Sequence, residues 1–194
     1  MTNLEYLNSL NEAQREAVSY LSGPLLIVAG AGSGKTRVLT SKIAHIVKEN
    51  KAYPNQILAV TFTNKAAKEM QNRVGILLKK EAIGLSWLGT FHSISAKLLR
   101  KHAAAANLKS NFSIIDQNDQ IRLIKNICKS ENIDIKKISP KYILGIIDNW
   151  KNKGWYPEQV TIKKKDVLEK SFLSIYKIYQ QKLIDLNACD FSDL

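Results

Sequence analysis

The sequence predicts an α/β fold in which a parallel sheet is followed by a mostly helical part. Up to about residue 93, short apolar runs of strand length alternate with segments of helical period, which is typical of a parallel sheet with right-handed crossovers. A glycine-rich loop separates the first run from the helix after it. From residue 94 to residue 188 helical periods dominate, so we expect a boundary near residue 94.

The first elements can be placed one by one. Apolar residues at helical spacing predict a helix over residues 6–21, which Ser22-Gly23-Pro24 ends. Residues 25–29 are continuously apolar, which predicts a strand buried on both faces of the sheet. Residues 30–34 form the glycine-rich loop, and residues 35–49 have the period of a helix.

Two further strand and helix pairs follow. We expect a buried strand over residues 57–63 and a helix over residues 65–79. A third strand-like run, residues 85–88, leads through residues 89–92 into another helix. Parallel strands place their carboxyl ends, and the loops that follow them, at one edge of the sheet.

Composition indicates a globular chain with polyanionic partners. Of 194 residues 45% are apolar and 24% are charged, and the net charge is +12. Such a charge favours nucleic acid or an anionic membrane surface, and charge alone leaves both open. The longest uncharged stretch, residues 17–34, is interrupted by glycine and proline, and the first residues lack the pattern of a secretory signal. We expect a soluble, cytoplasmic protein without a membrane partner.

Two smaller features concern the helical part. Cys128 and Cys189 lie far apart without a companion motif, which favours neither zinc nor a disulfide, and we expect both to be small buried residues. Residues 97–170 hold 16 Lys and Arg against 8 Asp and Glu. Within them, residues 150–156 interleave bases with aromatics and residues 163–165 are all lysine. These segments fit contact with nucleic acid or an ordinary surface equally well.

The clearest motif is a P-loop, because it follows an expected strand and opens an expected helix. Glycine lets successive backbone N–H groups surround a phosphate, Lys35 would reach the β- and γ-phosphates, and the Thr36 hydroxyl would ligate Mg²⁺. Ala29 stands where the strict pattern has glycine, which is a mild departure. A loop that binds nothing is disfavoured by the agreement of strand, loop and helix. The motif comprises Ala29, Gly30, Ala31, Gly32, Ser33, Gly34, Lys35 and Thr36.

The flanking motifs make the assignment more specific, because their order and spacing resemble the opening motifs of the UvrD/Rep/PcrA superfamily 1A DNA helicases. The resemblance continues more weakly to the last residue, so it covers essentially the whole chain. The motifs are Leu10-Asn11-x-x-Gln14-x-x-Ala17-Val18, the P-loop with Arg37, Thr61-Phe62-Thr63-Asn64-Lys65-Ala66-Ala67-x-Glu69-Met70 and Gly89-Thr90-Phe91-His92-Ser93.

The resemblance implies roles for the residues that match. Gln14 would read adenine, which favours ATP over GTP, Arg37 would lie near the nucleotide, and Lys35 and Thr36 would be catalytic, with Mg²⁺ on Thr36. Single-stranded DNA would follow a track on seven residues. The alternative is that the two phenylalanines among them are core residues and the histidine a bystander. The track residues are Phe62, Thr63, Asn64, Lys65, Thr90, Phe91 and His92.

The resemblance also implies domains and an activity. Residues 1–93 would be the N-terminal part of a RecA-like ATP-binding motor domain, residues 94–188 a basic helical insertion, and residues 189–194 the return to the motor domain. The complete protein would use ATP to move 3′-to-5′ on single-stranded DNA, to open junctions of single and double strands, and to serve DNA repair.

One expected motif is missing, because no Asp-Glu dipeptide occurs in the sequence to hold magnesium and position water. Asp116 follows a strand-like run, but its place corresponds to the helical insertion. The chain therefore resembles an N-terminal fragment that binds ATP and Mg²⁺ without hydrolysing ATP. A non-catalytic nucleotide- or DNA-binding P-loop module remains an alternative, and the track motifs disfavour a small P-loop kinase.

Overall fold

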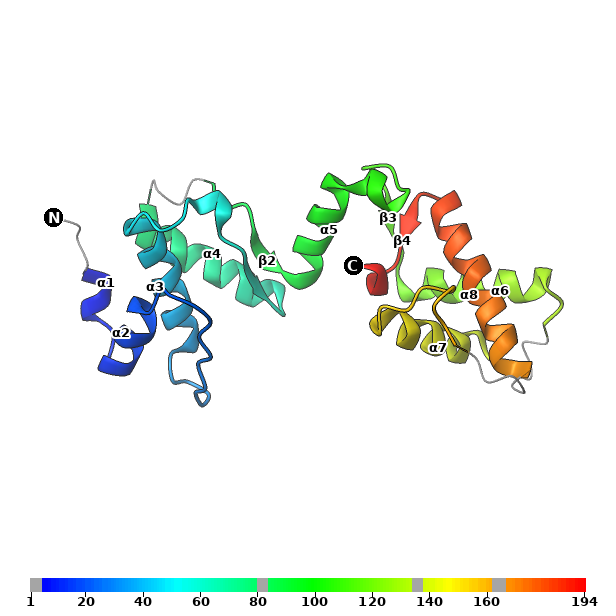
Figure 1. Cartoon of the computed structure of the whole chain (residues 1–194), viewed down its shortest axis with the longest axis horizontal. Coiled ribbons are helices and arrows are strands. Elements are labelled where there is room, and N and C mark those ends of the chain that lie inside the picture. The colour runs from blue at the N-terminus through cyan, green and yellow to red at the C-terminus, as the bar shows by residue number, and fades with distance from the viewer. Residues whose placement is uncertain (1–4, 80–83, 134–137, 162–166) are drawn as a thin grey trace. The chain divides into compact units, whose positions relative to one another are not determined.

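The computed structural model describes residues 5–79, 84–133, 138–161 and 167–194. The chain divides into two compact units, Met1–Ile94 and Ser95–Leu194 (Figure 1). Residues 163–165, the lysine run, lie outside the described part of the chain. None of the helices in the described residues is both long enough and apolar enough to cross a membrane.

The first unit consists of helices around a two-stranded parallel sheet. Strand β1 pairs with β2 in a register that joins Ala59 to Leu88 and Thr61 to Thr90. The main core of the first unit contains Met70 and Val74 of α4, both fully buried against α3 and the strands. The elements are α1 (Glu5–Asn8), α2 (Glu12–Ser19), α3 (Lys35–Lys48), β1 (Ala59–Thr61), α4 (Asn64–Leu78), β2 (Leu88–Thr90) and α5 (Phe91–Lys101), which continues into the second unit.

The structure confirms α3 and α4 and corrects three of the predicted elements. The single helix expected over residues 6–21 is two helices, because Asn11 caps α2: its Oδ1 accepts the Gln14 N–H at 2.9 Å. The strand expected over residues 57–63 is shortened to Ala59–Thr61, and the strand expected over residues 85–88 is displaced to Leu88–Thr90.

The buried strand predicted for residues 25–29 is wrong for this structure. These residues form no strand, and Leu26 and Val28 are almost fully exposed. A strand needs a neighbour to satisfy its backbone, and in the described residues of this unit β1 and β2 pair with one another. Apolar sequence alone therefore did not produce the strand.

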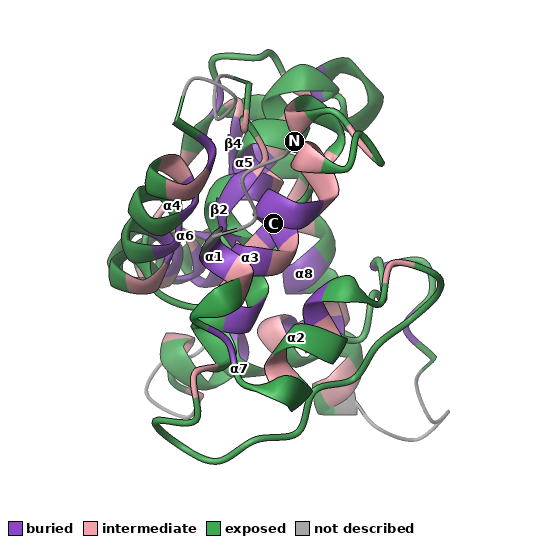
Figure 2. Ribbon diagram, turned by 90° about the vertical axis from the view of Figure 1, so that its left-hand side faces the viewer, coloured by how far each residue is buried: buried purple, intermediate pink, exposed green. Residues whose placement is uncertain are grey.

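The second unit is mostly helical, as predicted. Helices α6 (Gln117–Ser130), α7 (Pro140–Asn152) and α8 (Val167–Asp185) surround one apolar core, in which Trp150 stacks on Tyr176 with ring centroids 5.8 Å apart. The buried residues, purple in Figure 2, lie mainly on helices and short strands. Cys128 and Cys189 are both buried and free, as predicted. Strands β3 (Ser113–Ile114) and β4 (Ala188–Cys189) pair in parallel.

A buried ionic network ties α7 to the last turn of the chain. The Lys151 Nζ lies 2.7 Å from Asp190 Oδ2 and 2.7 Å from Asp193 Oδ1, and the Lys151 and Asp190 side chains are only 4% and 0% exposed. The Tyr179 hydroxyl donates to Asp190 Oδ2 at 2.9 Å. Two backbone N–H groups, of Ser192 and Asp193, donate to Asp190 Oδ1 at 3.0 Å. The Asp190 carboxylate is thus fully satisfied although it is buried.

The network shifts two pKa values in opposite directions. Burial alone would raise the pKa of Asp190, but the Lys151 ammonium and the hydrogen bonds from Lys151 and Tyr179 outweigh it and hold that pKa below its ordinary value. Burial raises the pKa of Asp148, and the neighbouring Asp190 charge adds to this, although the Ser192 hydroxyl donates to Asp148 and opposes it. Asp190 and Asp193 thus pair with one ammonium, and Asp148, which accepts from Ser192, is the carboxylate disfavoured as an anion.

Candidate functional site

The glycine-rich loop directs two groups of Ser33 at one carbonyl, that of Gly30. The Ser33 hydroxyl donates to the Gly30 carbonyl at 2.7 Å, and the Ser33 N–H points at the same oxygen at 3.4 Å. Gly32 and Gly34 have φ angles of 75° and 87°, a left-handed conformation that side chains rarely adopt. The sequence therefore needs glycine at these two positions to form this loop.

The loop ends at the exposed N-terminus of α3. The first backbone bond of this helix runs from the Val38 N–H to the Gly34 carbonyl at 3.0 Å. The N–H groups of Lys35, Thr36 and Arg37 precede it and point out of the helix end, where the helix dipole is positive. This end of α3 can therefore bind an anionic group such as a phosphate.

Lys35 and Thr36 lie at this helix end. The Lys35 Nζ donates to the carbonyls of Ala29 and Gly30 at 2.7 and 2.6 Å, so the ammonium is folded over the loop. A bound phosphate would offer its own oxygens to the Lys35 ammonium in place of these two carbonyl oxygens. Thr36 is exposed in the first turn, so its hydroxyl fits as a ligand for a magnesium ion that phosphates carry.

Gln14 is brought against the loop from α2. Its Oε1 accepts the Asn11 N–H at 3.2 Å, and its Nε2 donates to the Ser33 carbonyl at 3.0 Å. A Cβ on Gly34 would lie 2.8 Å from Gln14 Nε2, so glycine also makes room for this contact. One N–H and one lone pair of the amide remain for a ligand.

Arg37 lies differently from the other nucleotide-binding candidates. Its Nη1 approaches the Ser9 carbonyl at 3.4 Å, and it lines a cavity of about 290 Å³ with Tyr6, Thr40 and Arg73. Its guanidinium thus approaches the residue that follows α1. The structure brings Gln14, Lys35 and Thr36 together and leaves Arg37 beside them.

Two aromatic rings meet beyond the carboxyl ends of the strands. Because β1 and β2 are parallel and Thr61 pairs with Thr90, the residues that follow, Phe62 and Phe91, are neighbours. Their ring centroids are 5.3 Å apart. Phe62 is 90% exposed and Phe91 48%, so the alternative that both are core residues is wrong. Exposed apolar rings that contact one another suit a ligand that stacks.

The polar residues among the seven expected track residues differ in how exposed they are. Asn64, Lys65 and His92 are exposed. The Thr63 hydroxyl caps α4 by accepting the Ala66 N–H at 3.1 Å. Thr90 is buried, and its hydroxyl accepts the Ser93 N–H at 3.2 Å, so this side chain supports the turn and is not available to a ligand.

Gly89 of β2 and Ser93 in the first turn of α5 are two residues that sequence reasoning did not assign to the site. The Ser93 hydroxyl accepts the Thr90 N–H at 2.9 Å and donates to the Thr90 carbonyl at 2.9 Å. A Cβ on Gly89 would lie 2.6 Å from Ser93 Oγ. Gly89 and Ser93 therefore position Phe91, and the spacing of glycine, threonine and serine is the signal that could have found them.

Comparison with known proteins places this site in a family. The family model described as UvrD/REP helicase N-terminal domain matches residues 10–194. The chain belongs to this family. The described loop, Gln14 and the Phe62–Phe91 pair all lie within the part that the family model matches.

Curated relatives of the family match the whole chain. A probable DNA helicase II homolog of Rickettsia conorii is 46% identical over 197 residues, which cover 100% of this chain and 30% of the relative. The ATP-dependent DNA helicase PcrA of Staphylococcus epidermidis is 46% identical over 188 residues, 97% of this chain and 26% of the relative. DNA helicase II of Rickettsia typhi is 45% identical over 198 residues. The chain thus spans less than a third of these relatives' length.

Proposed function

We propose that this chain is the nucleotide-binding and strand-binding opening part of an ATP-dependent DNA helicase that moves 3′-to-5′ on single-stranded DNA. The observation that carries the proposal is the arrangement of the first unit, in which an exposed phosphate-binding loop and an exposed aromatic pair stand on one small α/β frame. The relatives, a DNA helicase II and an ATP-dependent DNA helicase PcrA, support it.

The family resemblance assigns a different role to each of three parts of the chain. Residues 1–93 belong to a RecA-like motor domain, residues 94–188 to a helical insertion, and residues 189–194 to the return. The motor couples ATP hydrolysis to opening of junctions between single and double strands, and it acts in the cytoplasm in DNA repair.

The chain's own residues have defined tasks at the nucleotide. The N–H groups at the start of α3 hold phosphate oxygens, the Lys35 ammonium leaves its two carbonyls to neutralise the β- and γ-phosphates, and the Thr36 hydroxyl holds Mg²⁺. Magnesium supplies charge neutralisation between the phosphates. The sequence lacks an Asp-Glu pair to orient water, so residues 1–194 alone bind ATP without turning it over.

A variant at Gln14 tests the proposed binding of ATP. Gln14→Ala removes the amide that would bond the adenine edge, so we expect the preference for ATP over GTP to shrink by about 1–3 kcal/mol. The bond to Ser33 is lost as well, so affinity for both nucleotides should fall. Displacement of a fluorescent ATP analogue by ATP and by GTP measures both effects.

A matched variant separates loss of the amide donor from loss of the cap that the Gln14 side chain supplies to α2. Gln14→Glu keeps an oxygen to cap the Asn11 N–H but has no donor for the Ser33 carbonyl. We expect it to fold as the wild type does and to lose discrimination. An unchanged ratio of ATP to GTP affinity in Gln14→Ala would remove the adenine-reading role.

A variant at Phe62 tests the proposed binding of single-stranded DNA. If bases stack on this exposed ring, Phe62→Ala should weaken single-strand binding by about 1–3 kcal/mol. Thermal unfolding should be nearly unchanged, because the ring is 90% exposed. Anisotropy of a labelled oligonucleotide and a melting curve on the same variant check both statements.

Tyr53→Ala is the control for Phe62, since Tyr53 is another exposed aromatic residue of the first unit. It should change neither measurement. Wild-type binding by Phe62→Ala, or equal weakening by Tyr53→Ala, would contradict a DNA contact at the aromatic pair. Binding should also weaken with salt, because backbone contacts release counterions.

A further inference from the structure

The loop that follows α7 in the second unit exposes two large aromatic side chains in succession. Trp155 is 41% exposed and Tyr156 is 65% exposed. Trp150 and Lys151, just before them, are instead held in the core and in the ionic network. The basic and aromatic segment 150–156 thus divides into a buried anchor and an exposed part. We call residues 153–156 the aromatic loop.

The aromatic loop is fixed by hydrogen bonds on both sides. The Gly154 N–H donates to the Lys151 carbonyl at 2.8 Å, with Gly154 at a φ of 70°, and the Trp155 N–H donates to the Trp150 carbonyl at 3.0 Å. The Tyr176 hydroxyl donates to the Trp155 carbonyl at 3.0 Å. A ligand that contacts these rings therefore meets a surface that is already ordered, which lowers the entropy cost of binding.

The charge of the aromatic loop comes from one residue. The Lys151 charge is compensated by Asp190 and Asp193, whereas Lys153 is exposed and places its Nζ 4.8 Å from the centre of the Trp155 ring. Residues 95–194 together hold 18 Lys and Arg against 11 Asp and Glu. An ammonium beside exposed rings in a basic unit is the combination that single-stranded nucleic acid uses for backbone contact and base stacking.

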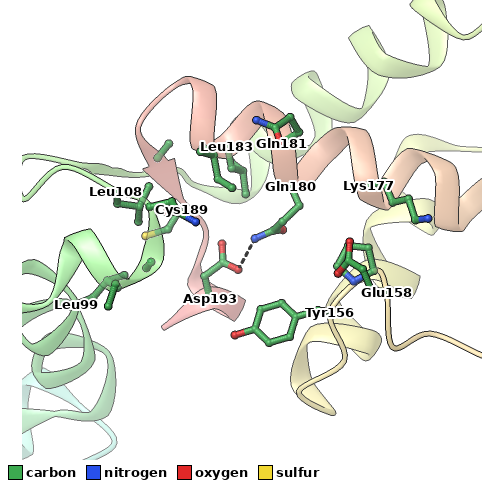
Figure 3. Close-up of a pocket in the computed structure, with 16 residues that line it drawn as sticks. Leu99, Leu108, Tyr156, Glu158, Lys177, Gln180, Gln181, Leu183, Cys189 and Asp193 are labelled. Atoms are coloured by element: carbon green, nitrogen blue, oxygen red, sulfur yellow. Dashed lines mark hydrogen bonds between the residues drawn. The ribbon is translucent and has the colours of Figure 1, made fainter.

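Tyr156 also borders an open space. It lines a cavity of about 560 Å³, and Figure 3 shows its ring between Asp193 and Glu158. The volume exceeds what one stacked base requires. Asp193 is paired with Lys151, and Glu158 and Lys177 add one charge of each sign to the lining, so Lys153 of the aromatic loop is the cation that we assign to the nucleic-acid backbone. Leu99, Leu108 and Leu183 contribute apolar lining, and Gln180 and Gln181 contribute amides.

We propose that the aromatic loop is a second contact for single-stranded DNA, at which bases stack on Trp155 and Tyr156 and Lys153 meets the backbone. The proposal rests on the proposed DNA partner but not on the aromatic pair of the first unit. It adds a contact that the motifs of the P-loop unit do not contain.

Tryptophan fluorescence tests the aromatic loop directly. In a Trp87→Phe background the remaining tryptophans are Trp150, which is buried, and Trp155, which is exposed. We expect an oligothymidylate at low salt to quench this fluorescence, and Tyr156→Ala to weaken the quenching titration about tenfold. Lys153→Gln should lower the slope of log affinity against log salt by about one.

Two control variants distinguish the aromatic loop from the Phe62–Phe91 pair as DNA contacts. Tyr142→Ala, at another exposed aromatic residue of the second unit, should leave the titration unchanged. Phe62→Ala should reduce total binding measured by anisotropy and leave the Trp155 quenching in place. Quenching lost in Tyr156→Ala and retained in Phe62→Ala supports the aromatic loop as a separate contact.

The opposite results overturn the proposal. If oligothymidylate binds through Phe62 yet leaves Trp155 fluorescence unchanged, the proposed function stands and the aromatic loop is not a DNA contact. Equal quenching in wild type, Tyr156→Ala and Lys153→Gln would also overturn it. Melting curves of Tyr156→Ala, Lys153→Gln and Tyr142→Ala, all at exposed side chains, show whether each remains folded.

Discussion

DNA-stimulated ATP hydrolysis by the full-length protein is expected to fall about 100-fold or more when Lys35 is replaced by Ala. The Lys35 ammonium is a flexible cation at the mouth of the loop, 2.6–2.7 Å from two loop carbonyls. Its removal leaves the glycine-rich backbone in place but takes away the charge that would neutralise the transferring phosphate. Steady-state phosphate release with and without single-stranded DNA measures the loss.

A second lysine serves as the control for Lys35. Lys51→Ala removes an exposed positive charge from the same unit, outside the glycine-rich loop, and should leave hydrolysis unchanged. Equal loss in both variants would indicate a general effect of charge. Full activity in Lys35→Ala would contradict the assignment of this loop as the phosphate site.

Loss of Lys151 is expected to destabilise the second unit strongly. Lys151→Met leaves the buried Asp190 carboxylate without its cation, and breaking such a pair costs about 3–5 kcal/mol of unfolding free energy. Arg122→Ala breaks the exposed pair with Asp119 and should cost less than about 0.5 kcal/mol. Urea unfolding at neutral pH compares the two variants. Similar costs for both would show that the network is not buried as described.

The same pair predicts a pH dependence. The folded-state pKa of Asp190 is lowered, so its contribution to stability is complete above the unfolded pKa of about 3.9 and is lost as the pH falls through the folded value. Asp148, whose pKa is raised, acts in the opposite direction, because acid favours its folded form. Asp148→Asn therefore isolates the acid loss that comes from Asp190.

The helices of the first unit could be predicted from sequence, whereas its strands could only be predicted in part. Helices α3 and α4 close their own hydrogen bonds, so their apolar period was a sufficient signal. A strand depends on a partner, and apolar residues 25–29 have none among the described residues of that unit. The break before Asn11 shows the reverse case, in which a local cap overrides a continuous apolar period.

The candidate site could be predicted by residue type but not by orientation. The motif named Gln14 and Lys35, but the contact of Gln14 with the Ser33 carbonyl depends on how α2 packs. The contact between Phe62 and Phe91 depends on the β1–β2 register, which no single motif contains. The family resemblance implied that Arg37 lies near the nucleotide, yet its long side chain extends toward Ser9, which follows α1.

The parallel pair β3–β4 determines how the second unit bears mechanical load. The chain enters this pair at Ser113 and leaves it at Cys189, and the two strands run in the same direction. Tension that pulls these two ends apart therefore slides one strand along the other and does not peel them open. The bonds from Ser113 N–H to the Asn187 carbonyl, at 3.1 Å, and from Ile115 N–H to the Cys189 carbonyl, at 2.9 Å, then share the force and fail together.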